Sequence, residues 1–189
     1  MHCRYSQESK TEKSSSEKIS LFRTFAEANR TVFLTTRDGS SGQLHARQMV
    51  PKVEKDLTHL FLYDKESHKH QEVKDDEHVN VAYDGGNQGW ASVAGTGSPS
   101  QDKELIKKVY NPSIKAWFAD LGDGVRDGSE NDPRIAILVV KPEEIRFYNQ
   151  KKTMIGQAID VAASAIGGDI ATPGEILTIT QEDVSGFRG

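Results

Sequence analysis

The feature that most constrains this fold is a succession of short segments rich in β-branched and aromatic residues, separated by Gly, Asp and Asn. Segments of this kind are typical of strands, and the residues between them favour hairpin turns. A parallel Rossmann-type sheet requires strands and helices that alternate regularly. The segments here do not alternate regularly with stretches of helical periodicity. We therefore predict a mainly β protein of the α+β class, an antiparallel barrel with peripheral helices. The predicted strands cover residues 31–36, 43–50, 59–63, 79–83, 90–96, 135–140, 145–148 and 175–180.

A few segments have helical character instead. Ser14 and Glu17 have the spacing of a capping box, which predicts that the first helix begins near Ser14. Ser67 is expected to cap a second helix, and Pro112 is expected to end a third. Residues 119–133 are rich in Gly and Asp, which predicts a loop. The predicted helices begin near Ser14 and cover residues 67–74, 102–110 and 154–166.

Composition separates a polar tail from a single domain. Residues 1–18 contain almost no core-forming side chains, which predicts a disordered tail because little apolar surface is available to offset the ordering entropy. We expect residues 19–189 to form one domain. Hydrophobic residues make up only 35% of the chain, a small share for one core. Burial between two subunits would supply further apolar contact, so the composition favours a homodimer.

The sequence excludes several classes of protein. The longest apolar run, residues 135–140, is far shorter than the roughly 20 residues of a membrane-spanning helix. The first residues lack the apolar stretch of a secretion signal, and the single cysteine, Cys3, fits a reducing compartment. A net charge of −4 offers no basic surface for nucleic acid. We expect a cytoplasmic protein with neither membrane nor nucleic-acid partners.

Motifs for metal binding and nucleophilic catalysis do not occur in the sequence. His68 and His70 are two residues apart, so a helix would not direct them at one ion, and no other His or Cys completes a zinc spacing. Segment 120–125 has Gly where a calcium loop needs oxygen ligands. No P-loop, dinucleotide fingerprint or nucleophile elbow is present. We predict no metal site and assign no catalytic residue.

One group of residues indicates a phosphate site. Arg47 lies on the second predicted strand, and Ser67 and Lys69 begin the helix that follows the third. Antiparallel pairing of these two strands would bring together a guanidinium, an ammonium, a hydroxyl and a helix N-terminus, which suit a phosphate dianion. The alternative is that both cations are solvated. Trp90 and Trp117 likewise fit either a core or interface role or a ring-stacking role.

Several motifs along the chain form one recognisable set. They are Ala46-Arg47, the turn 62–69, the strand 79–83, the segment 90–97, Tyr110-Asn111-Pro112, the segment 115–118 and Asp132-Pro133. This set resembles the FMN-binding split-barrel superfamily of the pyridoxamine 5'-phosphate oxidases. The segments 90–97 and 115–118 each contain one tryptophan, and their order resembles that in the general stress protein branch of this superfamily. That branch includes the fungal blue-light-inducible proteins. The resemblance covers residues 19–150 and is fainter beyond them.

The resemblance implies a six-stranded antiparallel Greek-key split barrel that forms a homodimer and binds FMN in a groove between the subunits. FAD or a deazaflavin is the alternative cofactor. Apolar and aromatic walls suit the flat flavin ring, as the cationic cluster suits the phosphate. The matching residues are Arg47, Ser67 and Lys69 at the phosphate, Tyr63, Asp64 and His68 in the phosphate turn, Gln48, Met49 and Val50 beside the ring, and Trp90, Ser92 and Trp117 near it, the last from the partner subunit.

Two departures from the family pattern affect the expected function. Asp64 and Lys65 stand where the family usually offers hydroxyls, and a carboxylate beside a dianion is unfavourable unless it points away or Lys65 compensates. The C-terminus, which ends in residues 186–189, does not match the basic and aromatic segment that completes the active site of true pyridoxamine-phosphate oxidases, which argues against vitamin B6 oxidation. We expect an FMN-binding protein of the general stress type with flavin-dependent oxidoreductase activity. The alternative is a flavin-binding or carrier module without turnover.

Overall fold

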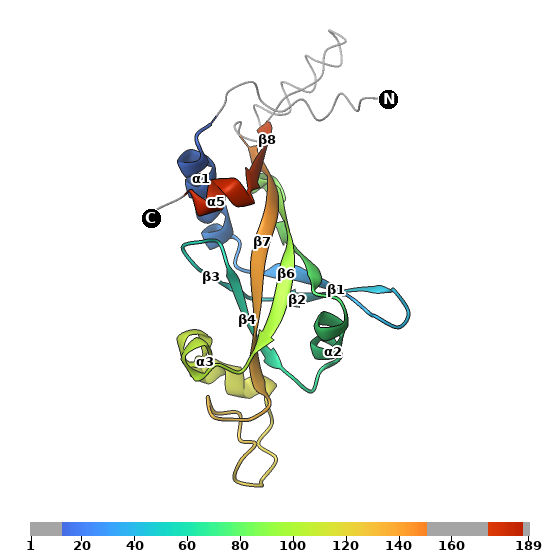
Figure 1. Ribbon diagram of the computed structural model, residues 1–189. Coiled ribbons are helices and arrows are strands. Elements are labelled where there is room, and N and C mark those ends of the chain that lie inside the picture. Colours follow the sequence, from blue (N-terminus) through green and yellow to red (C-terminus); the bar gives the residue numbers. More distant parts are fainter. Residues whose placement is uncertain (1–12, 151–173, 187–189) are drawn as a thin grey trace.

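The computed structural model describes residues 13–150 and 174–186 and is built around one curled antiparallel sheet (Figure 1). The strand order is β2-β1-β5-β6-β7-β4-β3, with β8 paired to β7. The prediction of a mainly antiparallel β fold with peripheral helices is confirmed. The strands are β1 (Val32–Arg37), β2 (Leu44–Met49), β3 (Lys52–Val53), β4 (His59–Asp64), β5 (His78–Asp84), β6 (Trp90–Ser100), β7 (Ile135–Gln150) and β8 (Gly174–Thr180).

The expected number of six strands is wrong, since the sheet has eight. Two predicted strands are the halves of β7, whose first half pairs with β4 and whose second half pairs with β8, while β6 runs beside both. Pro142 does not interrupt β7 because the β6 register shifts at Gly95, directly opposite. A side chain at residue 95 would collide with the carbonyl of Lys141, so this crossing requires glycine.

Short helices lie around the sheet, and the capping box at Ser14 and Glu17 is formed as predicted. The first helix thus begins at Ser15, before the expected end of the tail at residue 18; residues 1–12 and the predicted helix 154–166 lie outside the described residues. Residues 119–133 form a loop as predicted. The helices are α1 (Ser15–Ala28), α2 (His68–Asp75), α3 (Lys103–Val109), α5 (Gln181–Ser185) and the 3-10 turns η2 (Gly86–Gln88) and η3 (Pro112–Trp117).

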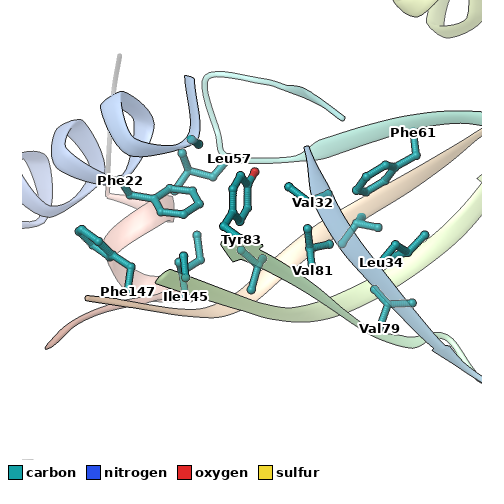
Figure 2. Close-up of a cluster of buried hydrophobic side chains, with 14 of the residues drawn as sticks. Phe22, Val32, Leu34, Leu57, Phe61, Val79, Val81, Tyr83, Ile145 and Phe147 are labelled. Atoms are coloured by element: carbon teal, nitrogen blue, oxygen red, sulfur yellow. The ribbon is translucent and has the colours of Figure 1, made fainter. Parts of the chain in front are cut away.

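The main core fills the concave side of the sheet beneath α1. Phe22 of α1 is fully buried and points toward Tyr83 and Phe147, with ring centroids 5.8 Å away in each case (Figure 2). A second apolar cluster lies where α3 and η3 cover β4 and β7. Its buried members are Leu60, Ile106, Phe118, Ile135 and Ile137. No helix in residues 13–150 or 174–186 is long and apolar enough to cross a membrane.

A polar side chain, His59, is enclosed in the main core. Its Nδ1 lies 2.7 Å from the carbonyl oxygen of Leu57 and its Nε2 lies 2.6 Å from the hydroxyl of Tyr83. The carbonyl can only accept, so Nδ1 donates to it and Nε2 accepts from the tyrosine. Burial lowers the pKa of His59 to about 4, against the opposing effect of the Leu57 carbonyl. The ring is therefore held neutral in the folded chain.

This neutral histidine predicts a loss of stability in mild acid. The unfolded chain takes up a proton near pH 6.5 and the folded chain only near pH 4, so the His59 contribution is complete above pH 6.5 and falls as the pH drops. The free energy of unfolding should fall by up to about 1.4 kcal/mol per pH unit in this range. Urea unfolding at several pH values measures it. A His59→Gln chain with the same pH dependence as the natural chain would contradict the assignment.

Candidate functional site

The structure brings Arg47, Ser67 and Lys69 together, but not by the strand pairing that we expected. β2 and β4 are separated in the sheet order, and no register joins them. Instead, β1 pairs with β2 and also contacts α2, which begins directly after the β4 turn (Figure 1). Arg47 lies opposite the buried Leu34, so its side chain is on the face of the sheet that α2 covers.

A buried carboxylate, Glu72, holds this arrangement. Its Oε2 accepts from Nη2 of Arg47 at 2.8 Å and also from the hydroxyl of Thr36, which in turn accepts from the same guanidinium. Its Oε1 lies 2.6 Å from Nδ1 of His45. Burial alone would raise the pKa of Glu72, and the bonds from Thr36, His45 and Arg47 together bring it below the usual value. Glu72 is thus a carboxylate that ties β1, β2 and α2 together.

Lys69 is a half-buried cation beside this network. Its Nζ donates to the hydroxyl of Ser67 at 2.8 Å and lies 5.6 Å from the ring centroid of Tyr63. Burial lowers the pKa of Lys69, and the charge of Arg47 lowers it further. Among the described residues, no carboxylate forms a salt bridge with Lys69. Arg47 and Lys69 thus present two positive charges, of which Arg47 is paired directly with Glu72, while Asp64 and Glu72 act on Lys69 only from a distance.

The N-terminus of α2 adds further donors. Ser67 stands at the N-cap as predicted, but its hydroxyl donates to the carbonyl of Asp64 and makes no capping bond. The first N–H groups of the helix are therefore not satisfied by a side chain. Asp64 accepts from the N–H of Glu66 at 2.8 Å, so one of its oxygens is engaged within the turn. Lys65 donates to Gln101 at 3.3 Å, not to Asp64.

The other predicted site residues lie elsewhere in the chain. Gln48 follows Arg47 on β2, so the two side chains point to opposite faces of the sheet. Ser92 lies in the same row as Gln48, through the paired residues Phe33 and Ala82, and so also faces away from Arg47. Trp90 alternates with Ser92 and shares that outer face. The remaining four are Met49, packed against the core; Val50, 63% exposed; His68, exposed at the start of α2; and Trp117, 84% exposed on η3.

Sequence reasoning missed Thr36, His45 and Glu72. His45 and Arg47 alternate along β2 and so share a face, and Glu72 follows Lys69 by three residues on one helix, which puts them side by side. These spacings were available in the sequence. The contact between the strand pair and the helix was not, because it depends on how α2 packs. Among the described residues, no group of three or more His, Cys, Asp or Glu side chains could hold a metal ion.

Comparison with known proteins identifies the family. The family model described as pyridoxamine 5'-phosphate oxidase like matches residues 17–171. The chain belongs to the pyridoxamine 5'-phosphate oxidase-like family. Protein bli-3 of Neurospora crassa is 37% identical over 175 residues, which are 91% of this chain and 84% of that protein. The resemblance found in the sequence motifs is therefore confirmed.

Solved structures of this family share the fold. The General Stress Protein 26 of Bacillus anthracis matches with a TM-score of 0.59 and 20% identity, over 69% of this chain and 93% of that one. The general stress FMN/FAD binding protein of Xanthomonas citri matches with a TM-score of 0.59 and 23% identity, over 74% and 93%. At these identities the likeness extends to the fold.

The Glu72 network predicts a large effect of a small substitution. Glu72→Gln keeps the shape of the side chain but leaves Arg47 without its buried counter-charge, so we expect the free energy of unfolding to fall by about 2 kcal/mol. Urea unfolding measures this. Glu130→Gln, which changes an exposed carboxylate in the 119–133 loop, is the control and should change stability little. Equal stabilities for the two variants would contradict the role given to Glu72.

Proposed function

We propose that this chain binds FMN, with the phosphate between Arg47, Lys69 and the N-terminus of α2. The observation that carries the proposal is Lys69, a half-buried ammonium beside Arg47 that forms no salt bridge in the described part of the chain, although the charges of Asp64 and Glu72 act on it from further away. An anion placed there would relieve both the charge repulsion and the cost of burial. Two cations, the Ser67 hydroxyl and helix N–H groups are the donors that a phosphate dianion requires.

The choice of FMN over FAD follows from the same donors. FMN ends in a phosphate monoester, which carries up to two negative charges, whereas each phosphate of a dinucleotide bridge carries one. The ring of FMN would lie along the end of β2, beside the backbone of Gln48, Met49 and Val50. The family membership and the FMN/FAD binding of the Xanthomonas citri protein support a flavin. Asp64 accepts the N–H of Glu66 within the turn, which fixes one of its oxygens, and its negative charge stays near Lys69.

The proposed activity is flavin-dependent oxidation or reduction of a small molecule in the cytoplasm. When bound, the flavin supplies the electron-transfer chemistry, and the protein supplies binding and orientation. Arg47 and Lys69 hold the phosphate, and Glu72 fixes the guanidinium of Arg47. A reducing compartment agrees with the lone cysteine, Cys3.

A homodimer is part of the proposal. Ser92, Trp90 and Gln48 face away from Arg47, and Trp117 lies on η3. Residues on opposite faces of one sheet cannot all contact the same ligand within one subunit, so a second copy would have to supply some of them. Exposed apolar side chains on and beside the β1–β2 edge offer a surface for it. They are Phe33 and Leu44, at 44% and 70% exposure.

The visible spectrum tests the flavin proposal. The purified chain, with and without added FMN, should show a bound-flavin spectrum and altered FMN fluorescence. A colourless protein that leaves the fluorescence of added FMN unchanged would overturn the proposal. Consumption of NAD(P)H by the loaded chain supports oxidoreductase activity, whereas its absence favours the carrier function.

The phosphate assignment predicts a selective effect of Lys69→Gln. Removing this charge should raise the FMN dissociation constant about tenfold, the equivalent of one charge-assisted hydrogen bond. Riboflavin has no phosphate, so its dissociation constant should stay the same. Lys74→Gln, at the far end of α2, is the matched control. Fluorescence titration of the natural chain and the two variants measures all six constants, and an equal loss for FMN and riboflavin in Lys69→Gln would contradict the assignment.

A further inference from the structure

A separate cavity of about 280 Å³ lies between the end of α1 and the segment that follows β2. Arg23, Glu27 and Arg30 line it from the helix side, and Val50 and Val53 line it from the strand side. Arg23 and Glu27 are four residues apart on α1 and so share one face of it, and Arg30 follows just after the helix ends at Ala28. Figure 1 shows this end of α1 next to the turn that carries β3.

The charges around the cavity are unbalanced. Arg23, Arg30 and Lys52 line it, against the single carboxylate of Glu27. Lys52 donates to the carbonyl of Lys108 at 3.0 Å, which draws its ammonium toward the end of α3. Within residues 13–150 and 174–186, no salt bridge joins Arg23 or Arg30 to a carboxylate. The two guanidinium groups are thus the charges left for a ligand, and such groups pair with carboxylate or phosphate.

The strand side of the cavity is apolar. Val50 is 63% exposed although it is a large aliphatic side chain, and Pro51 and Val53 continue the wall. A cavity with an apolar wall and a cationic wall fits a ligand that has an apolar part and an anionic part. An inorganic anion would leave the valine side uncovered, and a neutral hydrocarbon would leave the arginines unmatched.

The cavity is close to the place given to the flavin ring but separate from the phosphate cluster. Val50 follows Arg47 by three residues, which places it about 10 Å further along the strand direction. We propose that this cavity binds a small organic anion, a carboxylate or phosphate on an apolar body, beside the proposed flavin site. The position relative to the flavin rests on the proposed FMN function; the anion site itself does not.

The test is a titration of the full isotope-labelled chain with phenyl phosphate, followed by amide NMR, with and without saturating FMN. We expect shifts around residues 26–30 and 50–53 that persist when FMN is bound. Benzoate should act at the same residues, and the ratio of the two dissociation constants distinguishes a phosphate from a carboxylate site. Phenol, which lacks the anion, should bind at least about tenfold more weakly.

Matched variants locate the charge. Arg23→Gln/Arg30→Gln should weaken phenyl phosphate binding about tenfold or more and leave the FMN dissociation constant unchanged. Lys103→Gln/Lys107→Gln makes the same change in net charge on α3 and should leave both ligands unaffected. Phenol binding as tightly as phenyl phosphate, or FMN affinity lost in the arginine variant, would overturn the proposal. If FMN does not bind but the shifts appear, the flavin function fails and the anion site stands.

Discussion

The buried carboxylate of Glu72 is the interaction on which the rest of the site depends. It accepts from Thr36 on β1 and Arg47 on β2, and it belongs to α2. A carboxylate with 4% exposure is stable only when its bonds replace the lost hydration, and three donors do so here. Because those donors come from separate elements, Glu72 fixes the distance between the β1–β2 pair and the start of α2. The positions of Arg47 and Lys69 follow from that distance.

The same geometry divides the predicted flavin residues between two faces of the sheet. Arg47 and Met49 face the core side, and Gln48 and Ser92 face outward. A ligand that extends from the α2 cluster past the end of β2 would leave the core side near Val50, where the sheet edge is open to a second copy. The proposed subunit interface, if placed there, would account for both the small hydrophobic share of the chain and the exposed apolar side chains at this edge.

Local patterns predicted what is locally determined. The Ser14–Glu17 capping box and the position of Ser67 at the N-cap of α2 depend on spacing within a few residues. The predicted break between residues 140 and 145 is wrong, because β7 continues through Pro142 where the register of β6 shifts at Gly95. Glu72 was missed because its partners are distant in sequence. The six-stranded expectation came from the family resemblance, which does not register the two-residue β3 or the outer strand β8.

The state of the phosphate in the FMN-loaded chain tests the central claim most directly. A free phosphate monoester loses its second proton near about pH 6. Two cations and a helix N-terminus should keep bound FMN as the dianion, so its phosphorus NMR signal should be shifted from that of free FMN and stay constant from pH 5 to 8. A bound signal that titrates near pH 6 like the free cofactor would contradict the placement of the phosphate between Arg47 and Lys69.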